Sequence, residues 1–249
     1  KSDGTEAGTV MVKQVVDWSG TFPGELSDLT AVNGLLFFAA SDGTYGRELW
    51  KSDGTEAGTV MVKDIDDRSP PHFFQGNGDP GDLTDLDGIL YFTANDGVHD
   101  YELWKSDGTE TGTVMVKDIH PSHGSTPFGF FCVVGGVYFS ASDGVTGREL
   151  WRTDGTEEGT TLVYDIDLEP NAGSSPSRFA LFKGLLFFRV SLGDVYGNLW
   201  ALNVPPVGGG IALAAAASTN AQLVDFSVAF SEEVSGVDPG DFVVLANGP

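Results

Sequence analysis

Cysteine and basic residues are scarce in this chain of 249 residues, and each shortage excludes a class of protein. With a single cysteine, Cys132, no disulfide framework can form within the chain. Cys132 falls in the apolar run of residues 130–134, which favours a buried, inert thiol over a nucleophile. Against 36 aspartates and glutamates stand only 13 lysines and arginines, a net charge of −23, so a basic surface for nucleic acid or for an anionic membrane is excluded.

Long hydrophobic runs are missing as well. Outside the repeats, the longest is residues 211–217, far short of the roughly 20 residues that a membrane-spanning helix needs. No signal peptide is visible and the chain begins in the middle of a motif, so we expect a fragment or a processed form. The acidity predicts a soluble, self-repelling surface that attracts cations. Direct membrane insertion is not expected.

The sequence does contain a repeat. Residues 48–65, ELWKSDGTEAGTVMVKDI, return as residues 102–119 and 149–166. The tail of the motif opens the chain, and a degenerate head, NLWALN, closes the series. The tryptophans of the motif are 54, 47 and 49 residues apart, and they are Trp50, Trp104, Trp151 and Trp200. A period near 50 residues indicates an array of structural units rather than one irregular domain.

The centre of the motif, SDGT or TDGT, predicts a hairpin turn between two short strands. Asp53 can accept a hydrogen bond from the backbone N–H two residues on, and later copies place Asp107 and Asp154 at the same position. Gly54 and Gly58 can supply the positive φ angles that the turn needs. We expect Leu49 and Trp50, just before the turn, to belong to the core between units.

Upstream of the motif, each repeat contains two more strand-like runs. In the first repeat they are residues 26–32 and 35–40, joined by Asn33-Gly34, a strong signal for a two-residue hairpin. Corresponding turns are expected at Asp87-Gly88, Gly135-Gly136 and Lys183-Gly184. Four antiparallel strands in about 50 residues are typical of a propeller blade, whereas solenoid repeats are usually shorter. The sequence therefore predicts an all-β fold, a β-propeller of four-stranded blades in residues 1–204.

Four blades are expected, at residues 23–66, 79–119, 127–167 and 177–204. The last has only three strands, and residues 9–16 form a lone fourth strand near the start of the chain. That strand can complete the last blade and close a four-bladed ring with no open sheet edge, which we favour over a slice of a larger ring. Beyond the repeats, we expect a Gly- and Ala-rich linker in residues 205–218 and a truncated Ig-like β-sandwich segment in residues 219–249.

These motifs resemble, residue for residue, those of the ELWxxDGT repeat family of bacterial secreted and surface proteins. The resemblance covers about residues 1–204, and it departs from the pattern at Asn198 and after Trp200, where no DGT follows. The tail, FSVAFSEEVSGVDPGDFVV, is similar to the start of a bacterial Ig-like repeat of large adhesins. The resemblance implies an extracellular or cell-surface location, a multidomain parent protein and a propeller fold. It supplies no catalytic residues.

Three Asp-Gly loops are candidates for a metal. Asp42, Asp96 and Asp143 precede Glu48, Glu102 and Glu149 at a constant spacing of six residues. Carboxylates gathered on one loop face could coordinate calcium through their oxygens. The alternative is that the aspartates cap turns and the glutamates make structural hydrogen bonds, with Arg47 and Arg148 as possible partners. Recurrence in every unit favours the structural role.

Candidate ligand contacts lie in loops that do not repeat. His72, Phe73 and Phe74 could stack on sugars or contact a protein, or they could pack their loop onto its own blade. His120 and His123 could contribute two nitrogens to a metal. Because no third ligand follows at a useful spacing, two exposed loop histidines are the favoured interpretation.

We therefore expect a non-catalytic binding or adhesion module of an exported bacterial protein. Its contact surface is the variable loop face, and its partner is a carbohydrate or a protein at the cell surface. The alternative is a carbohydrate-active hydrolase or lyase with its site at the channel mouth. The arginines of sialidase-like chemistry are scarce, because only Arg178 and Arg189 of the six fall on first or second strands. Hydrolase, metalloprotease and nucleotide-binding motifs are absent from the sequence.

Overall fold

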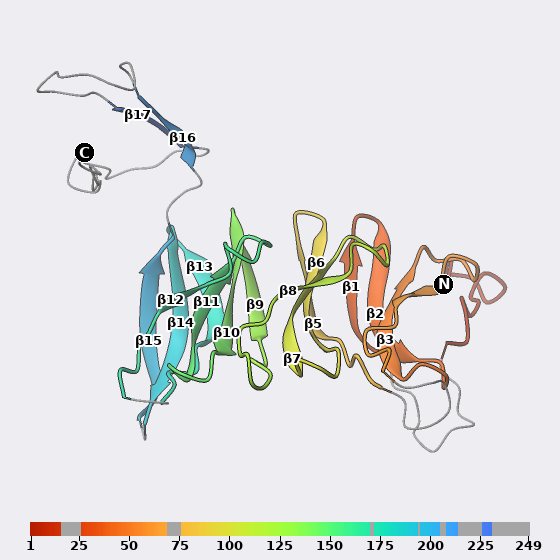
Figure 1. The fold of residues 1–249 in the computed structure, drawn as a ribbon. Coiled ribbons are helices and arrows are strands. Elements are labelled where there is room, and N and C mark those ends of the chain that lie inside the picture. The colour runs from red at the N-terminus through yellow and green to blue at the C-terminus, as the bar shows by residue number, and fades with distance from the viewer. Residues whose placement is uncertain are drawn as a thin grey trace, which may run out of the picture. The chain divides into compact units, whose positions relative to one another are not determined.

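The computed structural model describes residues 1–15, 26–68, 76–169, 172–193, 195–204, 208–213 and 226–230. Throughout these residues the regular structure consists of β-strands, and the strands pair in antiparallel sheets without any helix (Figure 1). The all-β prediction is confirmed. In the same residues, no helix exists that is long and apolar enough to cross a membrane.

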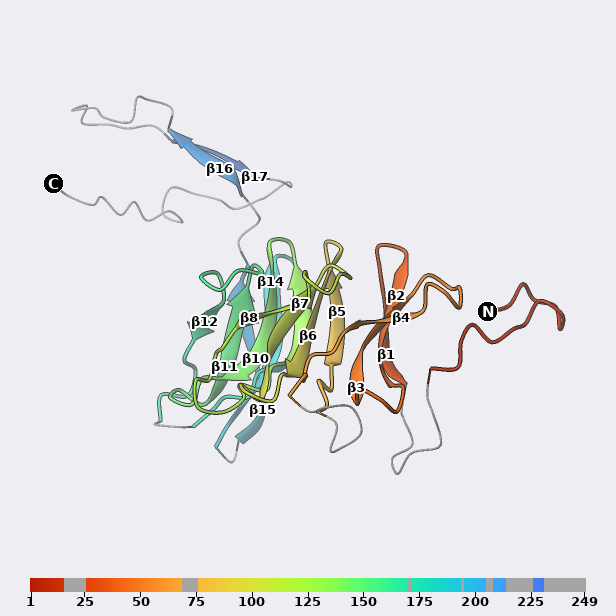
Figure 2. The same cartoon turned by 45° about the vertical axis from the view of Figure 1, so that its right-hand side comes forward.

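Three four-stranded sheets follow one another in the chain, each in the strand order first, second, third, fourth (Figure 2). The first contains β1 (Ser27–Val32), β2 (Leu35–Ser41), β3 (Arg47–Ser52) and β4 (Val60–Lys63). The second contains β5 (Gly81–Leu86), β6 (Ile89–Asn95), β7 (Tyr101–Ser106) and β8 (Val114–Lys117). The third contains β9 (Phe128–Val133), β10 (Gly136–Ser142), β11 (Arg148–Thr153) and β12 (Thr161–Tyr164). A fourth sheet has three strands, β13 (Ser177–Phe182), β14 (Leu185–Leu192) and β15 (Val195–Asn203).

The hairpins between first and second strands have the predicted chemistry, with one shift of register. Asn33 and Gly34 have φ angles of 49° and 79°, as a type I′ turn requires, and Asp87-Gly88 and Lys183-Gly184 also have positive φ at both residues. In the third sheet, Val133 pairs with Gly136, so the two turn residues are Val134 and Gly135 rather than the predicted Gly135-Gly136. Gly135 alone has a positive φ there, 88°.

The DGT hairpins are built around the aspartate. Asp53 Oδ1 accepts hydrogen bonds from Thr55 N at 2.8 Å and from Thr55 Oγ1 at 2.7 Å, and Gly54 has a φ of 84°. The prediction of a positive φ at Gly58 is wrong. Gly58 is needed for space instead, because a Cβ there would lie 2.1 Å from Asp53 Oδ1. Gly112 and Gly159 meet Asp107 and Asp154 in the same way.

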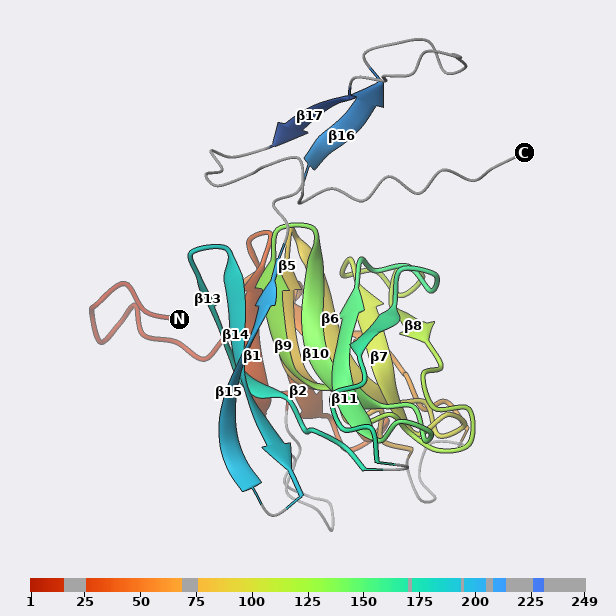
Figure 3. The ribbon, with the colours of Figure 1, turned by 90° about the vertical axis from the view of Figure 1, so that its left-hand side faces the viewer.

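Successive sheets pack face to face through the residues of the motif. Leu49 of the first sheet is fully buried with Val62 and Ile65, and the same cluster contains Phe92 and Trp104 of the second sheet. The second and third sheets repeat this arrangement with Leu103, Val116, Ile119, Phe139 and Trp151. The first strands of the three sheets are neighbours: β1 contacts β5, and β5 contacts β9 (Figure 3).

The N-terminal segment, residues 1–15, does not have the predicted position. None of these residues is in a strand, and β13, β14 and β15 form a sheet without them. Two of these residues contact the first sheet instead: Lys13 Nζ donates to the carbonyl oxygen of Thr59, and Val15 packs on Phe38 and Trp50. The expected completion of the last blade is therefore not present, and no closed ring is detected among the described residues.

The chain divides into two compact units. One consists of residues 1–180 and 187–200, and the other of residues 181–186 and 201–249. In the second unit, β16 (Gly208–Leu213) pairs antiparallel with β17 (Phe226–Phe230). β16 lies in the segment expected to be a linker, so part of that segment is a paired strand. The predicted Ig-like module otherwise falls mostly outside the described residues.

Candidate binding site

A cavity of about 600 Å³ opens where the variable loops lead into the first strands. Each of the first three sheets contributes residues from the start of its first or third strand. The residues that line the cavity are Asp28, Arg47, Asp79, Gly81, Asp82, Thr93, Tyr101, Thr126, Pro127, Phe128 and Arg148. The cavity thus lies on the face predicted from the loops, at the end of the strands opposite the DGT hairpins.

Arg47, Tyr101 and Arg148 begin the third strands of three sheets, so they occupy one position of the repeat. Arg47 is bound by carboxylates on both sides. Its Nη1 lies 2.5 Å from Asp79 Oδ1, and its Nη2 lies 3.1 Å from Asp28 Oδ2. Nη1 also donates to the carbonyl oxygen of Pro80 at 3.0 Å. In this part of the cavity, the charge of Arg47 is thus compensated by two carboxylates.

Tyr101 extends the same cluster. Its hydroxyl donates to Asp79 Oδ2 at 2.8 Å, so each oxygen of Asp79 has one partner. Burial and the hydrogen bond to Asp79 together raise the pKa of Tyr101 to about 12. Tyr101 is therefore a hydrogen-bond donor at neutral pH rather than a base.

Arg148 has a different environment, although it has the same place in the repeat as Arg47. Its Nη1 donates to the carbonyl oxygen of Thr126 at 2.8 Å, and its Nη2 to Thr126 Oγ1 at 2.9 Å. The guanidinium lies over the ring of Phe128, 5.0 Å from its centroid. No carboxylate of the described residues forms an ion pair with it. Burial lowers the pKa of Arg148, but an arginine stays charged at any physiological pH.

Irregular backbone at the start of the first strands positions the remaining cavity residues. Asp28 and Asp82 have positive φ angles of 57° and 55°, and the strand pairing shifts register between Ser27 and Thr30 and between Gly81 and Thr84. Such bulges redirect side chains and are common beside functional sites. Asp82 Oδ2 accepts a hydrogen bond from Gly129 N at 3.0 Å, which ties the second sheet to the third.

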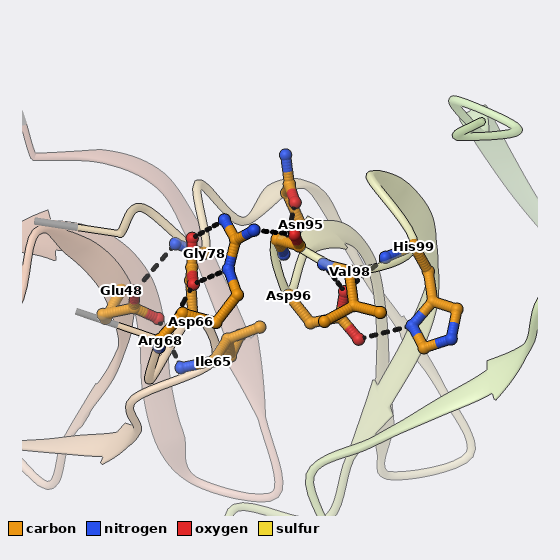
Figure 4. A network of polar contacts seen from close by, with 10 residues as sticks. Glu48, Ile65, Asp66, Arg68, Gly78, Asn95, Asp96, Val98 and His99 are labelled. Carbon is orange, nitrogen blue, oxygen red and sulfur yellow. Dashed lines mark hydrogen bonds and ion pairs between the residues drawn. The ribbon is translucent and has the colours of Figure 1, made fainter. Parts of the chain in front are cut away.

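Behind the cavity, the glutamate of each motif is a buried structural acceptor. Glu48 Oε2 accepts from Ile65 N at 2.9 Å and Glu48 Oε1 from Gly78 N at 2.7 Å (Figure 4). Glu102 accepts from Ile119 N at 3.1 Å and from both the backbone N and the hydroxyl of Ser125, at 2.8 and 2.5 Å. Glu149 has the same kind of partners in Ile166 and Ser174. These carboxylates bind the backbone that leads to the next sheet, and not the arginines suggested as partners.

Burial raises the pKa of all three glutamates, and that of Glu48 to about 8. Nearby Asp64 and Asp66 add to the shift at Glu48. Where the second and third sheets have Ser125 and Ser174, the first has Gly78, so Glu48 receives no hydroxyl hydrogen bond. These groups are enclosed in the packing and do not line the cavity.

The three aspartates considered for calcium each cap a turn. Asp42 Oδ1 accepts from Thr44 N and Tyr45 N, and Asp143 Oδ1 accepts from Val145 N and Thr146 N. Asp96 Oδ1 accepts from Val98 N and His99 N. Its Oδ2 lies 2.7 Å from His99 Nδ1, a contact that was not predicted and that is an ion pair when His99 is protonated (Figure 4). In the described part of the chain, no three His, Cys, Asp or Glu side chains are grouped so as to hold a metal ion. Calcium binding stays a prediction.

The candidate histidines lie outside the cavity. The rings of His120 and His123 are adjacent, with centroids 5.4 Å apart, but His120 Nδ1 accepts a hydrogen bond from His123 N at 3.1 Å. That nitrogen is thus used within the turn. The other candidates, His72, Phe73 and Phe74, lie outside the described residues.

The sequence does not point to Arg47 and Arg148 as cavity residues if only first and second strands are expected to face the channel. Both begin third strands, yet their long side chains reach the cavity beside the first strands. A register comparison gives the signal that was available: at one position the repeat reads Arg, Tyr, Arg, whereas the following Glu-Leu-Trp does not vary in these three copies. Phe128, at the start of β9, is a further cavity residue that was not predicted from the sequence.

No family model matches the chain, and no curated protein matches it. Among solved structures, the computationally designed Ika4 protein is similar over 79% of this chain and 99% of its own, with 16% identity and a TM-score of 0.43. An α-L-arabinofuranosidase from Clostridium thermocellum is similar over 70% of this chain and 66% of its own, with 17% identity and a TM-score of 0.30.

Proposed function

We propose that the chain is a non-catalytic carbohydrate-binding module of an exported bacterial protein, with its ligand in the cavity at the start of the first strands. The four sheets are then blades of a β-propeller of the ELWxxDGT type, and the cavity is one mouth of its channel. The residues that carry the assignment are the ones that differ between copies of the repeat. In an array of like units, a specific ligand needs a set of side chains that occurs once.

The observation on which the proposal rests is the contrast within one repeat position. Arg47 is neutralised by Asp28 and Asp79, whereas Arg148 has only neutral acceptors and an aromatic ring beside it. A charged, planar donor beside a partly exposed phenyl ring, in a cavity of this size, suits a sugar ring: hydroxyls accept from the guanidinium, and the apolar face of the sugar packs on Phe128.

A carbohydrate is favoured over a protein partner because the site is small and polar. A stable protein–protein contact buries about 800 Å² on each partner, and it is centred on an apolar patch. The residues around this cavity are mostly charged or hydroxylated, and the aromatic residues among them are Tyr101 and Phe128. Polar groups of this kind orient a hydroxyl-rich ligand.

A hydrolase or lyase in the same cavity is the second candidate, because three carboxylates line it. Two of them, Asp28 and Asp79, are held in ion pairs with Arg47, and Tyr101 occupies the other oxygen of Asp79. A general acid must hold a proton, and a nucleophile must have a free oxygen, so this pairing opposes both roles. The binding role needs no such group.

A glycan array followed by titration calorimetry tests the proposal. We expect binding of a defined class of saccharide, and loss of that binding in Arg148→Met, which keeps the bulk of the side chain but removes the donors. Arg189→Met, on β14 and away from the cavity, is the matched control and should bind normally. Saccharide turnover in a polysaccharide hydrolase and lyase screen would overturn the non-catalytic assignment. Binding that survives Arg148→Met would overturn the site.

A further inference from the structure

The partners of Arg47 show which groups neutralise an arginine at this position of the repeat. Its guanidinium donates to Ser27 Oγ, to Asp28 Oδ2 at 3.1 Å and to Asp79 Oδ1 at 2.5 Å. The first two partners begin β1, in the same sheet as the arginine, and the third lies in the segment that leads to the second sheet. Both carboxylates are therefore set by their places in the repeat.

The first of these carboxylates is missing beside Arg148. Gly129 of β9 stands where β1 has Asp28, and the backbone is alike at the two residues, with φ angles of 70° and 57°. The glycine also leaves the space of the side chain open. Apart from its chain neighbours, the described atom nearest to a Cβ at Gly129 would be Phe179 Cε2, at 3.6 Å, an ordinary van der Waals distance.

The second carboxylate is missing as well. Ser175 N donates to the carbonyl oxygen of Arg148 at 3.0 Å, as Asp79 N does to that of Arg47 at 2.9 Å. Ser175 thus stands where Asp79 stands in the first copy. The two carboxylates that neutralise Arg47 are replaced around Arg148 by a glycine and a serine.

The partners that Arg148 does have are neutral. Thr126 accepts two hydrogen bonds, at 2.8 Å on its carbonyl oxygen and at 2.9 Å on Oγ1. The carbonyl oxygens of Ser125 and Ser140 lie 3.5 Å from the guanidinium, at the limit of a hydrogen bond. Within the described residues, the Nε–H has no partner. The charge of this half-buried guanidinium is therefore uncompensated at the cavity.

We propose that the ligand is an acidic saccharide whose anionic group neutralises Arg148, as two carboxylates of the chain neutralise Arg47. This inference rests on the proposed function and specifies its ligand: the anionic group is the carboxylate of a uronic acid or a sulfate ester. Charge-assisted hydrogen bonds from a guanidinium to such a group are about twice as strong as neutral ones. The chain has 36 acidic residues, so the lack of a carboxylate at Arg148 does not reflect a shortage of them.

Asp82 gives the ligand a direction. It is the cavity carboxylate that forms no ion pair among the described residues, and its Oδ2 accepts a hydrogen bond from Gly129 N at 3.0 Å. A carboxylate repels an anionic group but accepts hydrogen bonds from sugar hydroxyls. The anionic group of the ligand therefore points toward Arg148, and a hydroxyl points toward Asp82.

A glycan array with matched neutral probes tests the class of ligand. It carries oligouronates beside their methyl esters, and sulfated oligosaccharides beside their desulfated forms. We expect titration calorimetry to give a Kd for an acidic glycan that is lower than that of its neutral counterpart by about tenfold or more. Whichever acidic glycan binds tells whether the group is a carboxylate or a sulfate ester.

The other outcomes of the array are distinct. Neutral glycans that bind as tightly as their acidic counterparts would overturn the acidic ligand and leave the carbohydrate-binding function standing. If no glycan binds, the proposed function itself fails, and the acidic ligand fails with it.

Gly129→Asp provides an independent test, because it returns the missing carboxylate to Arg148. Asp28 and Asp82 show that an aspartate is accepted at this position, with φ angles of 57° and 55°. The new carboxylate competes with the ligand, so the Kd for the acidic glycan should rise by about tenfold or more. Gly129→Asn is the matched control. It has the same shape without the charge, and it should weaken binding clearly less.

Equal losses of binding in the aspartate and asparagine variants would mean that Gly129 provides only space, and would overturn the contact between Arg148 and an anionic group. Urea unfolding of both variants shows whether they are folded. The comparison of acidic with neutral glycans uses the parent protein, so it decides the proposal even if neither variant folds.

Discussion

Arg47 and Arg148 occupy one position of the repeat, but their side chains have different partners. The first is enclosed by two carboxylates, and the second by carbonyl and hydroxyl oxygens and a phenyl ring. The next residue of the motif, by contrast, has the same environment in all three copies. Glu48, Glu102 and Glu149 are fully buried, and all accept hydrogen bonds from the backbone that leads to the next sheet. Adjacent positions of one motif thus serve different purposes.

The difference separates the scaffold from the site. A residue that recurs with the same partners in each copy explains how units fold and stack, and changing it should cost stability. A residue whose partners change from copy to copy is where a single ligand can be selected, and changing it should cost binding with little loss of stability. If this separation is wrong, substitutions at the two kinds of position will have similar effects on stability and binding.

The largest effect is expected for Glu102→Ala. The substitution leaves the backbone N–H groups of Ile119 and Ser125 and the hydroxyl of Ser125 without their acceptor in the packed interior. We expect the free energy of unfolding to fall by about 4 kcal/mol, measured by urea denaturation. Glu110→Ala, an exposed glutamate of the neighbouring hairpin, is the control and should change it by less than about 0.5 kcal/mol. Equal effects of the two substitutions would remove the scaffold role of the motif glutamate.

Glu48 should make stability depend on pH. Its pKa in the folded chain, about 8, lies above the ordinary value of 4.5, so the folded state holds a proton that the unfolded state releases. The contribution of Glu48 to stability is therefore greatest below pH 4.5 and is lost as the pH rises toward 8, by on the order of 3 kcal/mol. Denaturation curves at intervals from pH 5 to 8 should show this loss in the parent protein, and a flatter profile in Glu48→Gln. If stability depends on pH in the same way in the parent and in Glu48→Gln, a group other than Glu48 causes the dependence.

The DGT hairpin allows a double-mutant cycle. In Gly112→Ala the new Cβ would lie 2.1 Å from Asp107 Oδ1, so the hairpin must distort. We expect this distortion to lower the free energy of unfolding by about 2 kcal/mol. With Asp107→Ala already present that carboxylate is gone, and Gly112→Ala should cost clearly less. The coupling energy from thermal or urea unfolding of the four proteins measures the contact. Additive effects would mean that Gly112 is required for a reason other than the aspartate.

The same hairpin shows how far the sequence alone could lead. Asp53 and Gly54 were predictable because an Asx-turn and a positive φ depend on neighbours in the chain. The role of Gly58 was not, because it depends on where the carboxylate of Asp53 points after the turn has formed. The same limit applies to the site. The loop face was predictable from the strand order, but the reach of Arg47 and Arg148 depends on contacts between different sheets.

Arg148→Met should affect binding rather than folding. It removes a donor from the cavity without exposing a carboxylate, since none of the described residues pairs with Arg148. We expect the Kd for the saccharide found on the array to be at least tenfold higher than that of the parent protein. The free energy of unfolding should stay within about 1 kcal/mol of the parent value. Arg47→Met is the paired comparison. It leaves Asp28 and Asp79 close together without their cation, so it should lower stability more than Arg148→Met does.

The smallest effect is expected from calcium. In Asp42, Asp96 and Asp143, one carboxylate oxygen, Oδ1, already accepts two backbone hydrogen bonds of its turn. A ligand that binds the folded state raises the melting temperature with its concentration, so melting curves in millimolar calcium and in EDTA measure any such site. We expect the two curves to agree within about 1 °C, because the turns are complete without the ion. If calcium raises the melting temperature by more than this, and Asp96→Asn abolishes the increase, these aspartates bind the ion and are not only structural.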